Sequence, residues 1–254
     1  MGALVLYQFP VSHYCEKTRW QLDAKGLTYR LVNLIPGLHR YRTRRLGQRS
    51  STLPILMDDR RVIPDSTEIA LHLEREYDRR PLLPADDTGR RRALDLEDYF
   101  DDAFGIHCRR WMYYQVMSSP LLAEVVFRGY GAPARVMGRL MAPMLRRGLR
   151  SLYQLTAANA AESRACLLAG IDRLERELGD DPTRYLVGDA LSLADVTAAA
   201  LLAPLLSPLG SPWETPAGAE VPPEIAALRA EVNQRTAGKW LHARYATDRM
   251  RLAA

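Results

Sequence analysis

The stretch FPVSHYCEKTRW, residues Phe9–Trp20, follows a short apolar run, ALVLY, at residues 3–7. The apolar run predicts a buried strand, and the polar stretch predicts a helix that ends at Gly26, a residue suited to a helix C-cap. Ser12 is placed to cap the start of this helix, with Cys15 at about its third position. The chain therefore begins with a β-α unit whose first helical turn carries a hydroxyl and a thiol.

Beyond this unit the pattern keeps alternating to about residue 84. LTYRLVNLI, residues 27–35, predicts a second strand, and the polar residues 38–51 allow a short helix. LPILM and RVI, residues 53–57 and 61–63, flank a turn-like DDR and predict a hairpin. DSTEIALHLEREY, residues 65–77, predicts a capped amphipathic helix. The order β-α-β-α-β-β-α is that of the thioredoxin arrangement.

The second part of the chain is different in character. DRRPLLPADD, residues 78–87, combines charges with two prolines, as linkers do. After it, strand signals disappear and apolar residues recur at helical spacing. We therefore predict an α/β thioredoxin-like N-terminal domain over residues 1–80, a linker over 81–89 and an all-α helical C-terminal domain over 90–254. The predicted helical stretches cover approximately residues 88–117, 121–155, 160–178, 192–202 and 222–236.

The composition narrows the class of protein. Of the 254 residues 47% are hydrophobic and 26% are charged, which is typical of a globular protein. The three cysteines form no CxxC or CxxH pair, so neither a disulfide framework nor a zinc site is indicated, and a reducing cytoplasm fits best. The N-terminus lacks the basic region of a signal peptide. The longest apolar stretch, Val196–Leu209, is too short to span a bilayer, so we predict a cytoplasmic protein with no membrane partner.

The formal net charge is +5, and nearly all of the positive charge is arginine. A positively charged protein can bind nucleic acid, a membrane surface or acidic small molecules. Because the arginines are scattered through both halves with acids between them, we attribute the excess to genome composition and expect no nucleic-acid partner. His107 stands next to Cys108 but has no further partner at ligand spacing, and no metal is assigned.

Ser12 and Cys15 leave three interpretations open: a reactive pair, a helix cap with a buried thiol, or the remains of a redox motif. Ser12 has no base placed to activate it, and nothing indicates a Ser-His-Asp triad. If Ser12 acts chemically, it donates a hydrogen bond to an anion that the helix N-terminus also stabilises. Cys15 falls on the inner side of the first turn, where a buried inert thiol is favoured over a reactive one.

Two later motifs have a structural and a functional interpretation. Pro54 interrupts an apolar run, which indicates either an edge strand or a cis-proline that turns the Leu53 backbone outward to pair with an extended peptide ligand. Asp65 and Ser66 open a helix, and one of them is expected as its N-cap. The same helix start would bind a carboxylate through free N–H groups and the Ser66 hydroxyl, while Asp65 accepts from an ammonium group. Such a site suits an amino-acid headgroup.

In the second half, Ser192 and Asp195 of the SLAD sequence predict a capping box, which is a folding signal. An aromatic group between residues 99 and 114 is too dense for one helix face. Core packing is the simple interpretation of any single member, but some of the group must face solvent, a partner or an apolar cleft. Its members are Tyr99, Phe100, Phe104, Trp111, Tyr113 and Tyr114.

Four signals in order resemble the soluble glutathione transferase family, in its serine-type bacterial form. They are LYQFPVSHYCEKTRWQLDAKGL, the proline in TLPIL, DSTEIALHLE, and the late LVGDALSLAD. The resemblance covers most of the chain and is weakest between about residues 117 and 180. Two departures stand out: His13 takes the place of the usual proline after Ser12, and GQRSST replaces the Asn-Pro-x-Gly lead into the proline of TLPIL.

The resemblance implies a role for each candidate residue. Ser12 would be the catalytic group that stabilises the glutathione thiolate, with Cys15 as a neighbour and Tyr7 as a second-ranked activating hydroxyl. The backbone of Leu53, before Pro54, would pair with the cysteinyl unit of glutathione. The γ-glutamyl end would bind at Asp65 and Ser66. The helical domain would form an apolar pocket for the electrophile through Tyr99, Trp111 and Tyr114.

The function that the resemblance implies is that of a glutathione transferase, with glutathione as co-substrate and no metal. The thiolate would attack a small apolar electrophile in a detoxification reaction, and the protein would be a cytoplasmic homodimer. The alternatives are a glutathione-dependent isomerase or lyase on the same scaffold, a non-catalytic ligand-binding or protein-interaction member, and a thiol-disulfide enzyme that uses Cys15.

Overall fold

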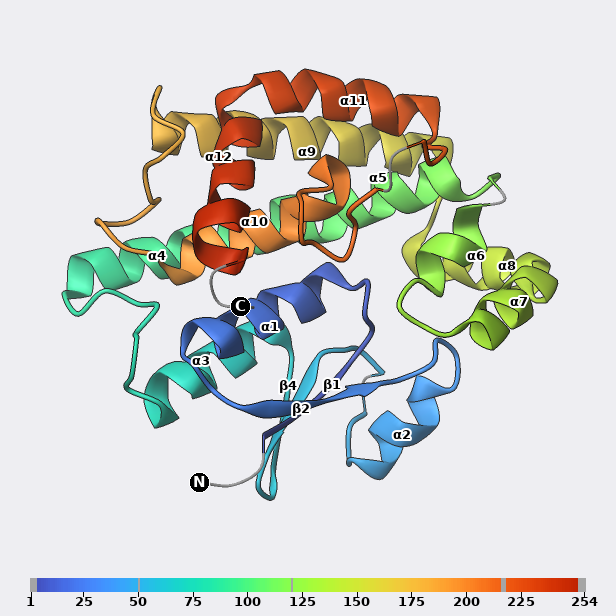
Figure 1. Ribbon diagram of the computed structural model, residues 1–254, viewed down its shortest axis with the longest axis horizontal. Helices are drawn as coiled ribbons and strands as arrows, with labels where there is room; N and C mark the ends of the chain where they lie inside the picture. The colour runs from blue at the N-terminus through green and yellow to red at the C-terminus, as the bar shows by residue number, and fades with distance from the viewer. Residues whose placement is uncertain (1–3, 50, 120, 216–217, 251–254) are drawn as a thin grey trace.

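The computed structural model describes residues 4–49, 51–119, 121–215 and 218–250, which form a small sheet with a helical layer stacked on it (Figure 1). The first part of the chain has the predicted order β-α-β-α-β-β-α. Its strands are β1 (Leu4–Gln8), β2 (Tyr29–Asn33), β3 (Ile55–Asp58) and β4 (Arg61–Pro64). Its helices are α1 (His13–Ala24), α2 (His39–Arg45) and α3 (Ser66–Glu76).

The four strands form one mixed sheet in the order β2-β1-β3-β4. The central strand β1 is parallel to β2 and antiparallel to β3, so Leu6 pairs with Leu31 on one side and with Leu56 on the other. The predicted hairpin is confirmed, because β3 and β4 are antiparallel and Asp58 pairs with Arg61 beside the turn. The thioredoxin-like arrangement of this part is therefore as the sequence predicts.

The two faces of the sheet carry different helices, because successive side chains of β1 point to opposite sides. Leu4 and Leu6 pack with Leu22 of α1 and Ile69 of α3. Figure 1 shows α1 and α3 between the sheet and the helical layer, while α2 lies on the other side. Tyr7 points to that other side. The central strand thus ends where α1 and α2 both approach it.

The remainder of the chain is helical, as predicted. Its elements are α4 (Asp87–Phe100), the π-helical turn η1 (Asp101–Ile106), α5 (His107–Val116), α6 (Leu121–Val126), α7 (Ala132–Leu140), α8 (Ala142–Tyr153), α9 (Ala157–Leu178), α10 (Leu193–Leu206), α11 (Pro223–Gln234), α12 (Thr236–Arg244) and the π-helical turn η2 (Tyr245–Arg249). All of α10 is buried, and Ser192 and Asp195 form the predicted capping box at its start. Trp20 of α1 packs into the same core, edge-on to Tyr245.

Several boundaries differ from the sequence prediction. The predicted helical stretch 88–117 is α4, η1 and α5 in succession, and the predicted stretch 121–155 is three short helices. Helix α12 was not predicted. The segment expected as a linker is packed, since Leu82 is buried and its carbonyl accepts the Leu193 N–H at 2.7 Å. The α/β and helical parts are therefore joined by an anchored segment.

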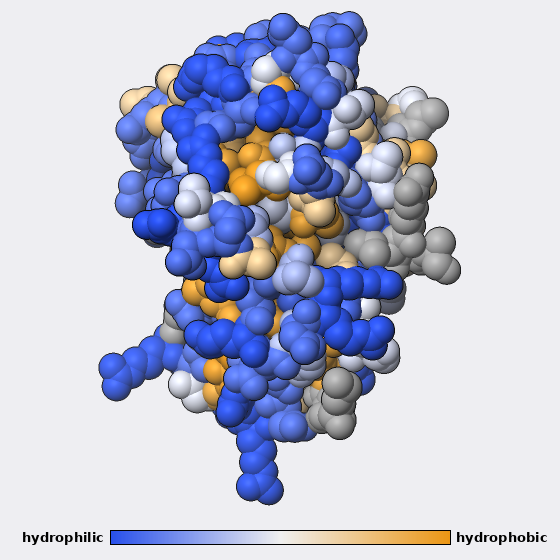
Figure 2. Space-filling model, turned by 90° about the vertical axis from the view of Figure 1, so that its left-hand side faces the viewer, coloured by the Kyte–Doolittle hydropathy of each residue, from blue (hydrophilic) through white to orange (hydrophobic). Residues whose placement is uncertain are grey.

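The outer surface is mainly polar. Figure 2 shows the face at the left of Figure 1, where hydrophilic side chains predominate and apolar ones gather mainly in the helical half. None of the helices formed by the described residues combines the length and apolar character needed to cross a membrane.

Candidate functional site

Ser12 caps α1 at the carboxyl end of the central strand. Its backbone is extended (φ −86°, ψ 125°), and its Oγ accepts the Cys15 N–H at 3.4 Å. The Ser12 carbonyl accepts the Glu16 N–H at 2.9 Å, which is the first bond of the helix. The hydroxyl oxygen acts as acceptor in this cap, and the hydroxyl also hydrogen-bonds the Cys15 thiol behind it, so donation to an anion outside the helix requires the hydroxyl to turn away from that thiol. The predicted capping role is confirmed, and the action on a ligand stays a prediction.

Cys15 is buried behind this cap. Burial raises the pKa of its thiol above the usual value, although the Ser12 hydroxyl and the Arg19 guanidinium act in the opposite direction. A protonated thiol without access to solvent is a poor nucleophile. Of the three interpretations of the pair, the geometry favours a helix cap with a structural thiol behind it.

The peptide bond between Leu53 and Pro54 is cis, which decides between the two interpretations of this proline. Strand pairing begins one residue later, where Ile55 lies opposite Tyr7. Because β1 and β3 are antiparallel, Leu53 lies beyond the end of β1, next to the turn that leads to Ser12. Its backbone is thus placed beside the start of α1, as pairing with an extended ligand requires.

Asp65 is the N-cap of α3, which settles the choice between Asp65 and Ser66. Its Oδ1 accepts the N–H groups of Thr67 at 2.8 Å and Glu68 at 3.3 Å. The backbone of Asp65 has φ 68° and ψ 138°, a conformation that non-glycine residues rarely adopt and that concentrates at functional sites. Ser66 follows with only 2% of its surface exposed. The strained turn presents the first N–H groups of α3 beside the exposed Asp65 carboxylate.

Lys17 joins the starts of α1 and α3 to the helical part. Its side chain is fully buried, and Nζ donates to Thr67 Oγ1 at 3.1 Å, to Asp101 Oδ1 at 2.6 Å and to Glu97. Thr67 Oγ1 in turn donates to Glu97 at 2.8 Å. The two helix starts that carry Ser12 and Ser66 are therefore held side by side by one ammonium group. Sequence reasoning gave Lys17 no role of its own.

Negative charge gathers near this junction. Burial raises the pKa of Asp101, while Lys17 lowers it and the neighbouring Glu97 and Asp65 raise it. Burial also raises the pKa of Tyr14, and the negative charge of Asp101 raises it further. Within the described part of the chain, no cluster of three or more His, Cys, Asp and Glu side chains could hold a metal ion. Organic cations such as an ammonium group are the species this charge would favour.

His13, the departure from the family pattern, lies between α1 and η1. Its Nε2 is 2.9 Å from the carbonyl oxygen of Gly105, and its ring packs against the Tyr14 ring with 4.7 Å between centroids. A side chain at Gly105 would meet the Tyr14 hydroxyl, since a Cβ built there lies 2.2 Å from Tyr14 Oη. The first turn of α1 is thus docked on the π-helical turn, a kind of segment often found at functional sites.

Tyr7 points away from this docking contact. It is buried, and its hydroxyl accepts a hydrogen bond from Arg42 of α2 at 3.1 Å. Arg42 and His39 line a hollow between α2 and the end of β2, together with Asn33, Leu34, Ile35 and Leu38. Tyr130 of the helical part donates a hydrogen bond to the carbonyl of Leu34, one of the lining residues. This hollow adds a cationic group that sequence reasoning did not identify.

None of the three aromatic residues predicted to form the electrophile pocket lines the α2 hollow or the cavity beside α5 described below. Trp111 is 3% exposed and lies in the helical core. Tyr99 is 39% exposed and contacts Phe100 and Arg173. Tyr114 is partly buried against the core. Tyr99 belongs to α4, whereas Trp111 and Tyr114 belong to α5, so the three side chains do not lie on one helix face and the core takes some of them.

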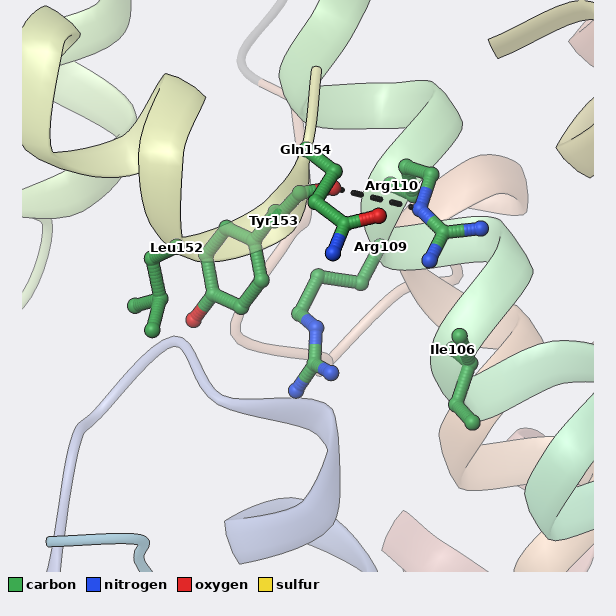
Figure 3. Close-up of a pocket in the computed structure, with 6 residues that line it drawn as sticks. All are labelled: Ile106, Arg109, Arg110, Leu152, Tyr153 and Gln154. Carbon is green, nitrogen blue, oxygen red and sulfur yellow. Dashed lines mark hydrogen bonds between the residues drawn. The ribbon is translucent and has the colours of Figure 1, made fainter. Parts of the chain in front are cut away.

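A cavity of about 130 Å³ lies instead between α5 and the end of α8 (Figure 3). Tyr153 supplies its aromatic wall, and Arg109 and Arg110 supply its charge. In Figure 3 the Arg109 side chain runs toward the turn that leads to α1. The other lining residues are Ile106, Leu152 and Gln154. The only sequence signal for this cavity was the Arg-Arg pair among the aromatic residues.

Two family descriptions match the sequence. "Glutathione S-transferase, N-terminal domain" matches residues 6–81, and "Glutathione S-transferase, C-terminal domain" matches residues 157–229. The first match contains the cap of α1, the cis-proline and the start of α3. No curated protein matches the chain significantly in sequence.

Many solved structures share the fold. A beta-etherase from Sphingobium sp. strain SYK-6 is 22% identical with a TM-score of 0.62, and covers 94% of this chain and 98% of its own. A glutathione S-transferase from Ceriporiopsis subvermispora, in complex with glutathione, is 17% identical with a TM-score of 0.63 and covers 96% of each chain. One from Methylobacterium radiotolerans, in complex with glutathione sulfonate, is 22% identical with a TM-score of 0.55, and covers 93% of this chain and 92% of its own. At these identities the likeness concerns the fold.

Proposed function

Because the chain belongs to the glutathione S-transferase family, we propose that it binds glutathione and activates the glutathione thiol for attack on a small electrophile. The observation that carries the proposal is the juxtaposition of two helix starts. Lys17 of α1 reaches Thr67 of α3 at 3.1 Å, so the Ser12 cap and the Asp65–Ser66 turn lie on the same side of the fold. Each start contributes N–H groups and the positive end of a helix dipole.

The charges around the junction match the γ-glutamyl end of glutathione. That end carries one carboxylate and one ammonium group. The carboxylate is suited to the first N–H of α3 and the Ser66 hydroxyl, because anions bind at helix N-termini. The ammonium group is suited to Asp65, whose Oδ1 caps the helix, with Asp101 adding negative charge nearby. The buried Lys17 holds these groups in place without reaching the ligand.

The other end of glutathione carries a second carboxylate. Arg42 and His39 at the α2 hollow would supply a cation and a hydrogen-bond donor for it. Between the two ends, the Leu53 backbone beside the cis-proline would pair with the cysteinyl unit. A ligand laid along this line passes the Ser12 hydroxyl at the end of β1.

The chemistry proposed for Ser12 is stabilisation of the thiolate. A hydroxyl donor and a helix N-terminus both favour the charged form of a thiol, and each pKa unit of lowering corresponds to about 1.4 kcal/mol. The thiolate then attacks the electrophile, and the proton released from the thiol passes to solvent. Holding both reactants together removes part of the entropic barrier.

The alternatives carry less support. A thiol-disulfide enzyme acting through Cys15 is disfavoured because that thiol is buried and its pKa is raised. A non-catalytic family member would bind glutathione but would not turn over an electrophile. Steady-state kinetics with electrophiles distinguish it from a glutathione transferase. We also propose a cytoplasmic location and a homodimer, and a measurement of molecular mass in solution would test the homodimer.

Calorimetric titration with glutathione tests the proposed site. Wild type is expected to bind, and Ser66→Ala is expected to weaken binding by roughly ten- to a hundredfold, because a hydrogen bond to a charged group contributes about 1.5–3 kcal/mol. Ser151→Ala is the matched control, since Ser151 is exposed on α8. Absence of binding by wild type, or equal binding by all three proteins, would contradict the proposal. Binding without turnover of any tested electrophile would favour the non-catalytic member.

A further inference from the structure

Arg109 of α5 is a charged residue without a charged partner. No Asp or Glu among the described residues lies within ion-pair distance of its guanidinium, and its Nε is buried without a hydrogen-bond partner. Arg109 as a whole is half-buried, and a charged side chain that is partly removed from water is normally paired, because the lost hydration is costly. The neighbouring Arg110 also has no acidic partner among the described residues, but it is held by hydrogen bonds: its Nε donates to the Tyr153 carbonyl at 3.2 Å and its Nη1 to Ser163 at 3.3 Å. The chain holds Arg110 by its own groups and leaves Arg109 available.

Aromatic rings hold the Arg109 guanidinium in position. Its Cζ lies 4.7 Å from the centroid of the Tyr153 ring and 5.4 Å from that of the Tyr14 ring. Tyr153 is itself stacked on Tyr113 at 5.3 Å. Contacts of this kind use the face of the guanidinium, so its edge N–H groups keep the geometry that binds a carboxylate through two parallel hydrogen bonds.

The position of Arg109 relates it to the proposed thiolate site. Tyr14 follows Ser12 by two residues in the first turn of α1, so the ring under the guanidinium belongs to the turn that Ser12 caps. Arg109 lines the cavity together with Tyr153 and Leu152, and Figure 3 shows its guanidinium directed toward the turn before α1. The cavity thus combines an aromatic wall, an aliphatic side chain and two arginines, of which Arg109 makes no hydrogen bond to the described residues.

We propose that Arg109 binds the anionic group of the second substrate, and that this substrate is an aromatic electrophile bearing a carboxylate. The carboxylate pairs with the edge of the Arg109 guanidinium, and the aromatic ring packs against Tyr153 and Leu152. The assignment of this ligand as second substrate rests on the proposed function. The binding of an aromatic acid at Arg109 does not depend on it.

A pair of probes that differ only in charge tests the proposal: a chloronitrobenzoate and its methyl ester. In both, the glutathione thiolate would attack the ring carbon that carries chlorine and displace chloride. Binding of each probe in the absence of glutathione and kcat/KM in its presence are measured for wild type, Arg109→Gln, Arg109→Lys and the control Arg147→Gln. Arg147 is an exposed arginine of α8, so its variant makes the same change in net charge.

Wild type and Arg147→Gln are expected to prefer the acid to the ester. In Arg109→Gln, binding and kcat/KM are expected to fall roughly tenfold or more for the acid and less than twofold for the ester. Only the acid loses its charge-assisted hydrogen bonds in this variant. For the acid, Arg109→Lys should give values between those of wild type and Arg109→Gln, since a lysine keeps the charge but cannot form the two parallel hydrogen bonds. Glutathione binding should stay within twofold in every variant.

Equal weakening of acid and ester in Arg109→Gln would overturn the proposal and make Arg109 a brace between Tyr14 and Tyr153. Lack of preference for the acid in wild type would overturn it even if the variants failed to fold. The two proposals fail separately: Arg109-dependent binding of the acid without glutathione binding contradicts only the proposed function. Glutathione binding without dependence on Arg109 contradicts only the anion site.

Discussion

The Nε2 atom of His13 lies 2.9 Å from the carbonyl oxygen of Gly105, 92 residues further along the chain. Burial lowers the pKa of His13 to about 3, with a further contribution from the Arg109 charge. The ring is therefore neutral at physiological pH and donates its Nε2 proton to the carbonyl. This bond connects the turn that Ser12 caps to η1, the segment whose last residue, Ile106, lines the neighbouring cavity.

Replacing His13 by Asn is expected to alter how stability depends on pH. At pH 7 the variant should be less stable by about 1–3 kcal/mol, because the buried Gly105 carbonyl loses its donor. In wild type the unfolded state binds a proton near pH 6.5 that the folded state binds only near pH 3. Lowering the pH from 7 to 4.5 should therefore remove roughly 2–3 kcal/mol through His13 alone. Urea unfolding of both proteins across this range measures it, and a constant difference would contradict the prediction.

Gly105→Ala is expected to disturb the docking of α1 on η1. The added Cβ would lie 2.2 Å from the Tyr14 hydroxyl, so either the ring or the helix turn must shift. Overpacking of this kind costs about 1–3 kcal/mol. Gly148→Ala in α8 is the control: nothing lies within 4 Å of its Cβ, and alanine is expected to stabilise the helix by roughly 0.5–1 kcal/mol. Thermal unfolding of both variants is the measurement. Equal effects would show that Tyr14 does not restrict this position.

Lys17→Met is expected to lower the free energy of unfolding by roughly 3–5 kcal/mol, because the buried Glu97 carboxylate would lose its counter-charge. Glutathione binding should weaken as well, since the starts of α1 and α3 are no longer joined. The control is Arg61→Met, which breaks an exposed pair with Glu76 and should cost less than about 1 kcal/mol. Similar losses of unfolding free energy in the two variants would contradict the inference that Lys17 holds the starts of α1 and α3 together.

Asp195→Ala tests the capping box of the buried helix α10. The Asp195 carboxylate accepts from the Leu186 N–H at 2.8 Å, the Ser192 N–H at 2.9 Å and the Ser192 hydroxyl at 2.6 Å. Losing these acceptors should cost about 2–4 kcal/mol, since buried donors are left unpaired. The exposed neighbour Asp189 provides the control variant Asp189→Ala, for which unfolding in urea should be unchanged. A fully stable Asp195→Ala protein would show that the box has no stabilising role.

The elements that sequence patterns predicted are those set by local rules. The strand and helix order of the first part follows from alternation, caps and turns, and the Ser192–Asp195 box depends on residues three apart. The buried position of Cys15 also followed from a local argument. These features need no knowledge of which segments meet in space. The sequence left Pro54 open between an edge strand and a cis-proline, and the structure decides for the cis bond.

The parts of the site that were missed depend on contacts between distant residues. The partner of His13 could not be identified, because Gly105 lies in a π-helical turn that the helical pattern of residues 88–117 does not reveal. The role of Arg109 depends on Tyr14 and Tyr153, which precede and follow it by many residues. The aromatic pattern named Trp111 for a pocket, but the arrangement of the helices places it in the core. The spacing of apolar residues identifies the buried face of each helix, but it does not identify the residues against which that face packs.

Titration of the bound glutathione thiol tests the central claim most directly. The ultraviolet absorbance of the thiolate is followed against pH for glutathione bound to wild type, Ser12→Ala and Ser151→Ala. Wild type and Ser151→Ala should hold the thiol pKa well below that of free glutathione. Ser12→Ala should raise the pKa of the bound thiol by about one unit or more, and each unit corresponds to about 1.4 kcal/mol of lost thiolate stabilisation. The affinity for glutathione should change only a few fold. A Ser12→Ala protein whose bound thiol titrates as in wild type would contradict the account.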